Sequence, residues 1–469
     1  MDASSARAAD LPRFPRGFRW GAATAAFQIE GSTTADGRGP SIWDTFTAEP
    51  GRVVDGSNAL VAADSYRRYR DDIAELVDLG ATDYRFSISW PRVQPGGTGP
   101  ANAAGLDHYE RFVDALAEAG IAPLVTLYHW DLPQPLEDAG GWLARDTAAR
   151  YAEYVGLVLD RLGDRVGRWI TLNEPAMTTL EGYALGTQAP GRQLMLGALP
   201  TVHHQLLGHG LAVAAIRAAG SGSGSGSVEV GITNNHTLVV PASSDPADLM
   251  AAGAFDLVYN RTFIDPVLTG AYPDLSAFGL EVFPGLEDGD LEVISAPLDF
   301  YGVNSYNPTY VAAPAEGSEF ALAGLPFEPA EPPAGTPVTG FDWPVVPAAF
   351  GELLVSLHRD YGDALPPVVI TENGASYPDQ VVTGAEGSRA VHDVERIAYL
   401  DGHLRAVADA IEQGVDVRGY FVWSLMDNFE WAQGYTQRFG LVHVDFETGE
   451  RTRKDSFAWY RDLVAAQER

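Results

Sequence analysis

Two glutamates in this chain stand where a short apolar segment runs into turn residues. The segment 169–172 leads into Asn173-Glu174-Pro175, and the segment 368–371 leads into Glu372-Asn373-Gly374. A carboxylate at the end of a buried strand is costly to desolvate unless it has partners or a chemical task. Two converging carboxyl groups can hydrolyse a glycoside, with a separation of about 5–5.5 Å for retention and roughly 6.5–9.5 Å for inversion. Either glutamate alone could instead cap a helix or pair with an arginine.

Tryptophans add to this pattern. Trp130, Trp343, Trp423 and Trp431 lie at expected strand ends or in a long loop. The CH-rich faces of sugars pack on aromatic rings, whereas their hydroxyls need polar partners. Core packing is the alternative explanation for each ring taken singly, but four rings at the same end of a sheet favour a sugar site.

Helices with one apolar face must hold these residues in place. Apolar residues recur at spacings of three and four, and a glycine follows the last of them, which is typical of a helix end. The expected helices lie at 66–77, 106–116, 151–162 and 397–411.

Short apolar segments alternate with these helices, at 18–27, 82–89, 122–128, 167–173, 228–234, 298–304, 367–372 and 418–424. Continuous apolar character is typical of parallel strands buried on both faces. Eight such strands predict a (β/α)₈ TIM barrel of the α/β class with enlarged βα loops, in which reactive groups sit at the strands' C-terminal ends. A doubly wound open sheet is the alternative, although no glycine-rich nucleotide motif follows an early strand.

We expect a single catalytic domain over residues 1–469, because the alternation continues across the chain. Residues 1–16 form an N-terminal extension. Residues 220–227 alternate glycine and serine, which predicts a flexible loop. Residues 308–347 are rich in proline, glycine and alanine, follow a strand, and are predicted to form a loop of the active site.

Composition excludes several classes of function. The chain holds 31 basic and 63 acidic side chains, for a net charge of −32, which disfavours nucleic acids and anionic membranes as partners. Cysteine is absent, which removes disulfides, thiolate nucleophiles and cysteine-bound zinc. We found no apolar run of about 18 residues and no secretory signal, so we expect a cytoplasmic protein. No cofactor and no metal are expected, and the histidines near position 204 lack a metal-binding spacing.

Seven motifs, in order, resemble those of family 1 glycoside hydrolases, the β-glucosidase type. The resemblance covers nearly the whole chain, and it is specific because the motifs occur in the expected order and at the expected spacings. They lie at 18–24, 28–31, 84–92, 128–133, 171–175, 370–374 and 423–431.

The resemblance implies a role for each matching residue. Glu174 corresponds to the acid/base and Glu372 to the nucleophile, with Arg85 and Tyr306 contacting the nucleophile and Asn304 lying near it. The remaining matches bind the substrate, as hydroxyl ligands, sugar platform or aglycone contact: Gln28, His129, Trp130, Asn173, Trp343, Trp423, Glu430 and Trp431.

The expected enzyme is therefore a retaining β-glucosidase that acts on terminal β-D-glucosyl residues of short oligosaccharides or aryl and alkyl glycosides. β-Galactosides and β-fucosides are further possible substrates, and a role in cellulose and polysaccharide degradation follows from the family. The Glu430–Trp431 pair indicates substrates without a 6-phosphate, which a carboxylate would repel. A non-catalytic sugar-binding barrel and a transglycosylating enzyme are the alternatives. The sequence leaves open the preferred sugar and whether the protein is a monomer or a homo-oligomer.

Overall fold

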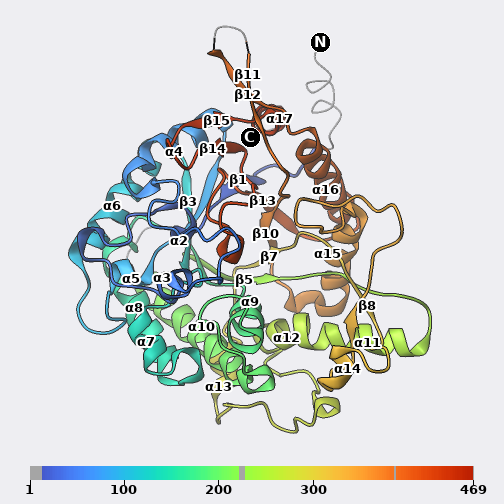
Figure 1. The fold of residues 1–469 in the computed structure, drawn as a ribbon. Helices are drawn as coiled ribbons and strands as arrows, with labels where there is room; N and C mark the ends of the chain where they lie inside the picture. Colours follow the sequence, from blue (N-terminus) through green and yellow to red (C-terminus); the bar gives the residue numbers. More distant parts are fainter. Residues whose placement is uncertain (1–12, 221–227, 385–386, 468–469) are drawn as a thin grey trace.

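Eight parallel strands close into a barrel in the computed structural model, which describes residues 13–220, 228–384 and 387–467 (Figure 1). The barrel closes where the first and last strands pair, from Arg19 opposite Gly419 to Ala23 opposite Trp423. The predicted TIM barrel is confirmed, and the open-sheet alternative is wrong. In order around the barrel the strands are β1 (Arg19–Ala23), β13 (Val417–Trp423), β10 (Val368–Asn373), β7 (Phe300–Asn304), β5 (Glu229–Asn235), β4 (Arg168–Asn173), β3 (Ala122–Tyr128) and β2 (Asp83–Ser87).

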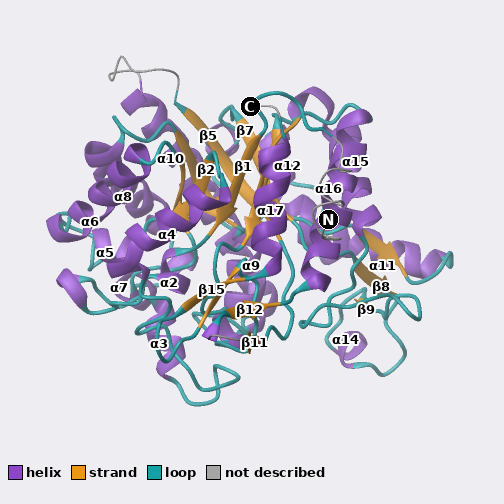
Figure 2. Ribbon diagram, turned by 90° about the horizontal axis from the view of Figure 1, so that it is seen from above, coloured by secondary structure: helices purple, strands orange, loops and turns teal. Residues whose placement is uncertain are grey.

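A ring of helices surrounds the barrel, one after each strand (Figure 2). Whereas α10 is buried on nearly all sides, most of these helices bury an apolar stripe against the strands, as the three-and-four spacing predicts. Helix α8, for example, turns Tyr151, Tyr154, Val155 and Val158 inward. In chain order the helices are α4 (Ser65–Leu79), α6 (Ala103–Glu118), α8 (Asp146–Leu162), α10 (Leu199–Gly220), α12 (Thr262–Thr269), α15 (Pro347–Tyr361), α16 (Val394–Glu412) and α17 (Asp455–Ala466).

Side chains fill the barrel interior, so the barrel is a packed core. The interior cluster contains Leu124, Ile170 and Val369 together with the rings of Phe300 and Phe421. Glycines make room for the two rings. A Cβ atom at Gly21 would lie 2.6 Å from the Phe421 ring, and one at Gly231 would lie 2.6 Å from the Phe300 ring.

One predicted strand is too long at its C-terminal end. The segment 18–27 was expected to be extended, but β1 ends at Ala23 and helix α2 (Ala26–Ile29) follows. The Ala26 amide donates to Ser87 Oγ at 2.7 Å, which turns the chain out of the sheet. Because α2 begins so early, Gln28 faces the end of the barrel instead of extending the strand.

Short strands and hairpins lie at the C-terminal end of the barrel. Three short strands, β6 (Val239–Pro241), β8 (Thr309–Ala312) and β9 (Glu328–Pro329), form one sheet, and the predicted 308–347 loop supplies two of them. Two hairpins complete this layer, β11 (Val381–Thr383) with β12 (Arg389–Val391) and β14 (Val442–Val444) with β15 (Arg451–Arg453). The short helices are α3 (Ile42–Ala48), α5 (Trp90–Val93), α7 (Gln134–Asp138), α9 (Pro175–Met177), α11 (Pro246–Asp256), α13 (Asp290–Ile294) and α14 (Glu319–Leu322).

Two sequence predictions fall largely outside the described residues. Helix α10 ends at Gly220, and residues 221–227 of the predicted glycine–serine loop are not described. Most of the predicted N-terminal extension, residues 1–12, is likewise not described. Within the described part of the chain, no helix combines the length and the apolarity that crossing a membrane requires.

Candidate active site

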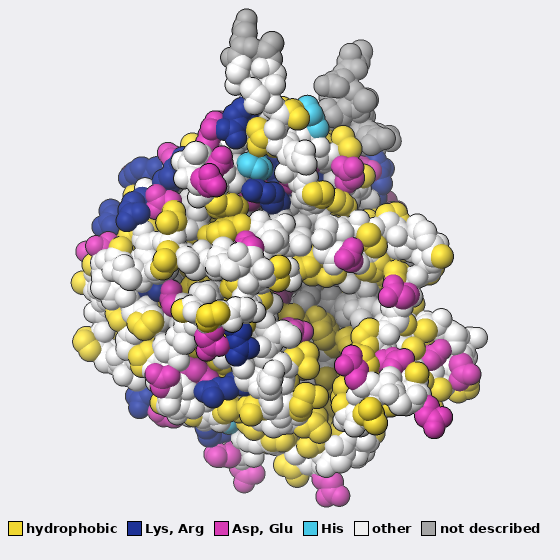
Figure 3. Space-filling view, viewed as in Figure 1, with side chains coloured by type: hydrophobic (Ala, Val, Ile, Leu, Met, Phe, Trp, Pro, Cys, Tyr) yellow, Lys and Arg dark blue, Asp and Glu magenta, His cyan; other side chains and the backbone are white. Residues whose placement is uncertain are grey.

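A cavity of about 310 Å³ opens at the C-terminal end of the barrel, and it is visible as a hollow near the middle of Figure 3. The structure brings nine sequence-predicted residues together in its wall. Most of them follow directly from the ends of different strands, which is where a parallel barrel places reactive groups. They are His129, Trp130, Glu174, Tyr306, Trp343, Glu372, Trp423, Glu430 and Trp431.

Glu372, on β10, is almost completely buried, and both of its carboxylate oxygens accept hydrogen bonds. Arg85 Nη1 donates to Oε1, and the Tyr306 hydroxyl donates to Oε2 at 2.6 Å. Arg85 reaches this point from β2, with its side chain only 1% exposed. Burial and the nearby Glu372 carboxylate raise the pKa of Tyr306 well above its ordinary value, so its hydroxyl remains a donor. A buried carboxylate with a cation and a phenol as donors is compensated in its charged form.

Glu174 follows β4 in a left-handed backbone conformation, with a φ of 47°. Non-glycine residues rarely adopt this conformation, and it is held here by the start of helix α9 at Pro175 and by the bond from the Glu174 amide to Thr233 O at 2.8 Å. Trp130 and Trp431 also have positive φ values, of 73° and 52°. Such strain concentrates at functional sites because the surrounding structure must be built to maintain it.

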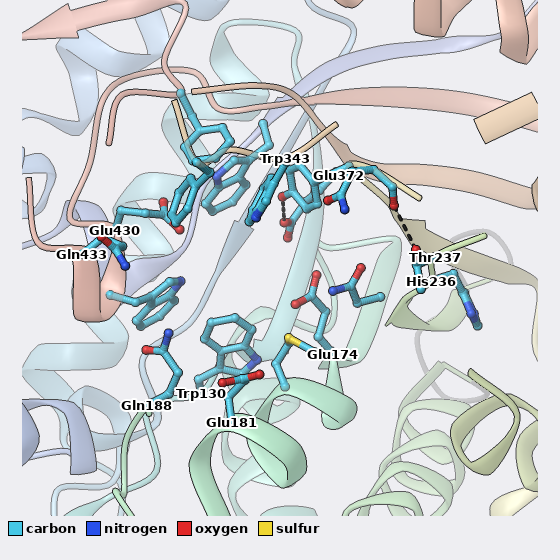
Figure 4. Close-up of a pocket in the computed structure, with 18 of the residues that line it drawn as sticks. Trp130, Glu174, Glu181, Gln188, His236, Thr237, Trp343, Glu372, Glu430 and Gln433 are labelled. Atoms are coloured by element: carbon cyan, nitrogen blue, oxygen red, sulfur yellow. Dashed lines mark hydrogen bonds between the residues drawn. The ribbon is translucent and has the colours of Figure 1, made fainter. Parts of the chain in front are cut away.

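The carboxyl groups of Glu174 and Glu372 point toward one another in the cavity (Figure 4). Burial raises the pKa of Glu174 to about 8, and the negative charge of Glu372 adds to this rise. The hydrogen bond from Asn304 and the charge of Arg85 act in the opposite direction. A protonated carboxyl group therefore faces a charge-compensated carboxylate, which is the arrangement that acid-assisted displacement requires.

Asn304 lies beside Glu372, as the resemblance implies, but its side chain contacts Glu174. Its backbone pairs with that of Glu372 in the sheet, but its side-chain nitrogen donates to Glu174 Oε1 at 2.5 Å and to Asn173 Oδ1 at 3.1 Å. The Asn304 carbonyl accepts from Thr371 Oγ1 at 2.7 Å, and this bond fixes which end of the amide faces Glu174. Asn304 therefore links the two strands that carry the glutamates.

Four predicted residues lie behind the cavity wall instead of lining it. Arg85 and Asn304 hold the glutamates, and Asn173 accepts from Arg85 Nη2 at 2.6 Å. Gln28 lies behind Glu430, with its nitrogen 3.4 Å from Glu430 Oε2. The buried Gln28 oxygen has no hydrogen-bond partner among the described residues.

Glu430 and His129 occupy the same side of the cavity. Burial, followed by the charge of Glu372, raises the pKa of Glu430 to about 8. Burial and the Arg85 charge hold the pKa of His129 well below its ordinary value, so its imidazole is neutral. His129 Nε2 lies 3.0 Å from Asn173 Nδ2, and His129 Nδ1 has no partner among the described residues. Neutral and unsatisfied polar groups of this kind suit sugar hydroxyls, which both donate and accept.

The four tryptophans predicted to share one end of the barrel do line one cavity. Trp431 packs on Trp130 with ring centroids 4.6 Å apart, and Trp130 Nε1 donates to Asn173 O at 2.9 Å. Trp343 comes from the predicted 308–347 loop and stacks on Phe341 at 4.5 Å. Trp343 also packs near the Tyr306 ring at 5.5 Å, so the long loop covers the nucleophile side of the cavity.

Sequence reasoning missed several residues of the cavity wall. Two of them carried a signal: Met177 follows Glu174 by three positions and Glu181 follows Met177 by four, which places all three on one face of a helix. Thr309 and Phe341 belong to the 308–347 loop that was predicted to form part of the active site. The others come from segments without a distinguishing pattern: Gln188, Asn235, His236, Thr237, Tyr259, Asn307, Gln433 and Phe439.

A buried ion-pair network stands behind the cavity, centred on Lys454, the one lysine of the sequence. Lys454 Nζ donates to Asp427 Oδ1 at 2.7 Å and to Asp379, and its side chain is 0% exposed. Asp379 also pairs with Arg396, and Asp427 with Arg438. Asp427 belongs to the segment between Trp423 and Glu430, so the network anchors a wall of the cavity to the helical ring.

Replacing Lys454 with methionine is expected to lower the free energy of unfolding by about 3–5 kcal/mol, because it leaves two buried aspartates without their shared cation. Thermal and denaturant unfolding of purified protein measure the loss. Arg418→Met is the matched control, since the Arg418–Asp416 pair is more than half exposed and exposed pairs contribute little. Equal stability of the Lys454 variant and the wild type would show that the network does not stabilise the fold.

Together, the closed parallel barrel and the facing carboxyl groups in an aromatic cavity define an enzyme class, the glycoside hydrolases. Comparison with known proteins supports this class. The profile of glycosyl hydrolase family 1 matches residues 11–469. The chain belongs to glycosyl hydrolase family 1.

Several relatives match over nearly their whole length. The chain is 43% identical to a β-glucosidase A of Acetivibrio thermocellus, covering 96% of this chain and 98% of the relative. It is 46% identical to a bifunctional β-D-glucosidase/β-D-fucosidase of Bifidobacterium breve, with the same coverage. The crystal structure of a psychrophilic β-glucosidase from Micrococcus antarcticus superimposes with a TM-score of 0.91 at 45% identity, covering 100% of both chains.

Proposed function

We propose that this protein is a retaining β-glucosidase in which Glu372 is the nucleophile and Glu174 is the acid/base. The observation that carries the proposal is that the carboxyl groups of Glu174 and Glu372 face each other in one cavity (Figure 4), with Arg85 and Tyr306 donating to Glu372. The raised pKa of Glu174, about 8, suits its role as the acid. The names of the relatives support the choice of β-glucosides, and the bifunctional relative supports β-fucosides as further substrates.

In the first step, Glu372 attacks the anomeric carbon while the bond from that carbon to the aglycone oxygen breaks. Glu174 gives its proton to the departing oxygen, so the aglycone leaves as a neutral alcohol and the sugar remains as an ester of Glu372. As the ester forms, Glu372 loses the negative charge that Arg85 and Tyr306 compensate in the free enzyme.

In the second step, Glu174 takes a proton from water, and the water oxygen attacks the anomeric carbon. The ester bond breaks, Glu372 returns to its carboxylate form, and the sugar is released with its original anomeric configuration. Formation of the ester removes the charge that helped raise the pKa of Glu174, which turns the acid into a base. An alcohol in place of water would give transglycosylation by the same bond changes.

The remaining predicted residues bind the non-reducing sugar in this proposal. Glu430 and His129 present polar groups to the hydroxyls, Gln28 supports Glu430 from behind the wall, and Trp423 provides the platform under the ring. Contacts that tighten as the ring distorts lower the barrier more than contacts made equally in the ground state. The cavity also disfavours a 6-phosphate on the sugar, because Glu430 is acidic and no lysine or arginine in the described wall would compensate the phosphate charge.

A panel of kcat/KM values over 4-nitrophenyl β-glycosides and cellobiose tests the proposal. We expect β-glucosides and β-fucosides among the best substrates, with the β-anomer of the free sugar as first product in NMR spectra. The α-anomer as first product would exclude retention, and failure to cleave any β-glycoside would exclude the function.

Activity is expected to fall as the pH rises through about 8. Glu174 must be protonated to assist departure of the aglycone, and its raised pKa keeps it protonated at neutral pH. Above that pKa, kcat/KM for an alkyl β-glucoside should drop about tenfold per pH unit. Glu430 titrates in the same range. In Glu174→Gln, measured with a 2,4-dinitrophenyl glucoside, the alkaline loss should disappear; its persistence would assign the loss to Glu430.

The proposal also covers the extent of the domain, the cellular location and the source of the substrates. We infer one catalytic domain over residues 1–469, acting in the cytoplasm on short glycosides such as those released from cellulose. The absence of cysteine is compatible with a reducing compartment. Cell fractionation tests the location, and growth of a deletion strain on cellobiose tests the substrate class. Size-exclusion chromatography with light scattering gives the oligomeric state.

A further inference from the structure

The acidic side chains that line the cavity are not matched by lysine or arginine in its described wall. Among the described residues, the wall contains four glutamates and no lysine or arginine. Its two histidines are neutral, because burial holds the pKa of His129 well below its ordinary value and lowers that of His236 to about 4. Three of the glutamates, Glu174, Glu372 and Glu430, have roles in the proposed reaction. The fourth, Glu181, has none.

Glu181 lies further along the helix that begins at the acid/base. Helix α9 continues into a π-helical stretch, Thr178–Leu185, and Glu174, Met177 and Glu181 all face the cavity. Glu174 lies on the aglycone side of the anomeric centre in the proposed mechanism, because it gives its proton to the aglycone oxygen. The helix that begins after Glu174 therefore starts on that side. Glu181 therefore lies about two turns beyond the reacting bond on that side.

The Glu181 carboxylate accepts a hydrogen bond from Thr187, and the Trp130 ring lies beside it (Figure 4). Thr187 Oγ1 donates to Glu181 Oε2, and the Gln188 amide donates to Glu181 O at 3.1 Å. Figure 4 shows Glu181 beside Trp130 and Gln188. Tyr259, another residue of the wall, has its pKa raised by burial and then by the charges of Glu174 and Glu181. Both carboxyl groups thus act on the same part of the cavity.

We infer that Glu181 determines which aglycones the enzyme accepts according to their charge. An aglycone bearing a protonated amine is favoured, since the amine meets the Glu181 carboxylate and the face of the Trp130 ring. An aglycone bearing a carboxylate or a sulfate is disfavoured, since no cation in the described wall compensates it. The inference rests on the proposed β-glucosidase function and specifies its substrates.

Three phenyl β-glucosides that differ in one substituent test the inference. The meta position carries an aminoethyl, a carboxyethyl or an uncharged propyl group, so the leaving oxygen has nearly the same acidity in all three. We expect wild-type kcat/KM for the amine to exceed that for the carboxylate by at least about tenfold at low salt, and the ratio to shrink in 0.5 M NaCl. Glu181→Gln should lower the ratio at least about threefold.

Glu412→Gln is the matched control, because it removes the same charge from an exposed position at the end of α16 that leads into β13, opposite the cavity. A ratio near one in the wild type would overturn the inference without any variant. An equal change of the ratio in Glu181→Gln and Glu412→Gln would also overturn it, since net charge alone would then be responsible. If the uncharged propyl compound is not hydrolysed by the wild type, the proposed function itself fails.

Discussion

Glu372→Ala is expected to reduce kcat for β-glucosides by a factor on the order of 10⁵, because in the proposed mechanism Glu372 forms the glycosyl ester. Removing the carboxylate also leaves the Arg85 cation facing the anomeric carbon, which opposes the positive charge that develops there. Steady-state and single-turnover kinetics with 2,4-dinitrophenyl β-glucoside measure the loss.

Added azide or formate should restore part of the activity of Glu372→Ala. A small anion fits the space of the missing side chain, is attracted by Arg85, and attacks from the same face as the lost carboxylate. With azide, one displacement then gives the α-glucosyl azide, which NMR distinguishes from the β-form. Glu412→Ala is the control for losing a carboxyl group at the opposite end of the barrel. Near-normal turnover of Glu372→Ala without added anion would show that another residue is the nucleophile.

Glu174→Ala is expected to act selectively on substrates that need a proton. For cellobiose and alkyl glucosides, kcat/KM should fall about 10²–10⁴-fold, which is the usual contribution of a general acid. A 2,4-dinitrophenolate leaves without protonation, so formation of the ester from that substrate should be far less affected. The measurement is a plot of log kcat/KM against leaving-group pKa, which should be steeper for Glu174→Ala than for the wild type.

Azide provides a second test of Glu174. In Glu174→Ala the glycosyl ester loses the base that activates water, whereas azide needs no base, so added azide should accelerate turnover and give the β-glucosyl azide. The two variants should therefore yield azides of opposite configuration. The same configuration from both would contradict the assignment of the two roles.

The sequence is sufficient to predict the barrel because parallel strands buried on both faces leave a strong local signal. Strands such as β3, which spans the predicted residues 122–128, consist almost entirely of apolar side chains. The end of β1 was predicted less well, because it depends on the bond between the Ala26 amide and Ser87, a contact between segments distant in sequence.

In the candidate site, too, residues with a local sequence signal were predictable, whereas contacts between distant segments were not. Glu174 and Glu372 stand out because each is a carboxyl group at the end of an apolar strand. The partner of Asn304 could not be predicted, since its backbone pairs with Glu372 while its side chain crosses to Glu174. Glu181 was detectable from its spacing to Glu174, but a glutamate on a helix is usually solvent-exposed, and only the three-dimensional structure shows that it lines the cavity.

The single buried lysine has a consequence for handling the protein. Amine-directed reagents such as succinimidyl esters ordinarily label many surface lysines at random. Here every other basic side chain among the 31 is arginine, and Lys454 is enclosed by Asp379 and Asp427. Such reagents should therefore modify the folded chain mainly at its α-amino group, which would give a uniformly oriented attachment to a surface or a dye.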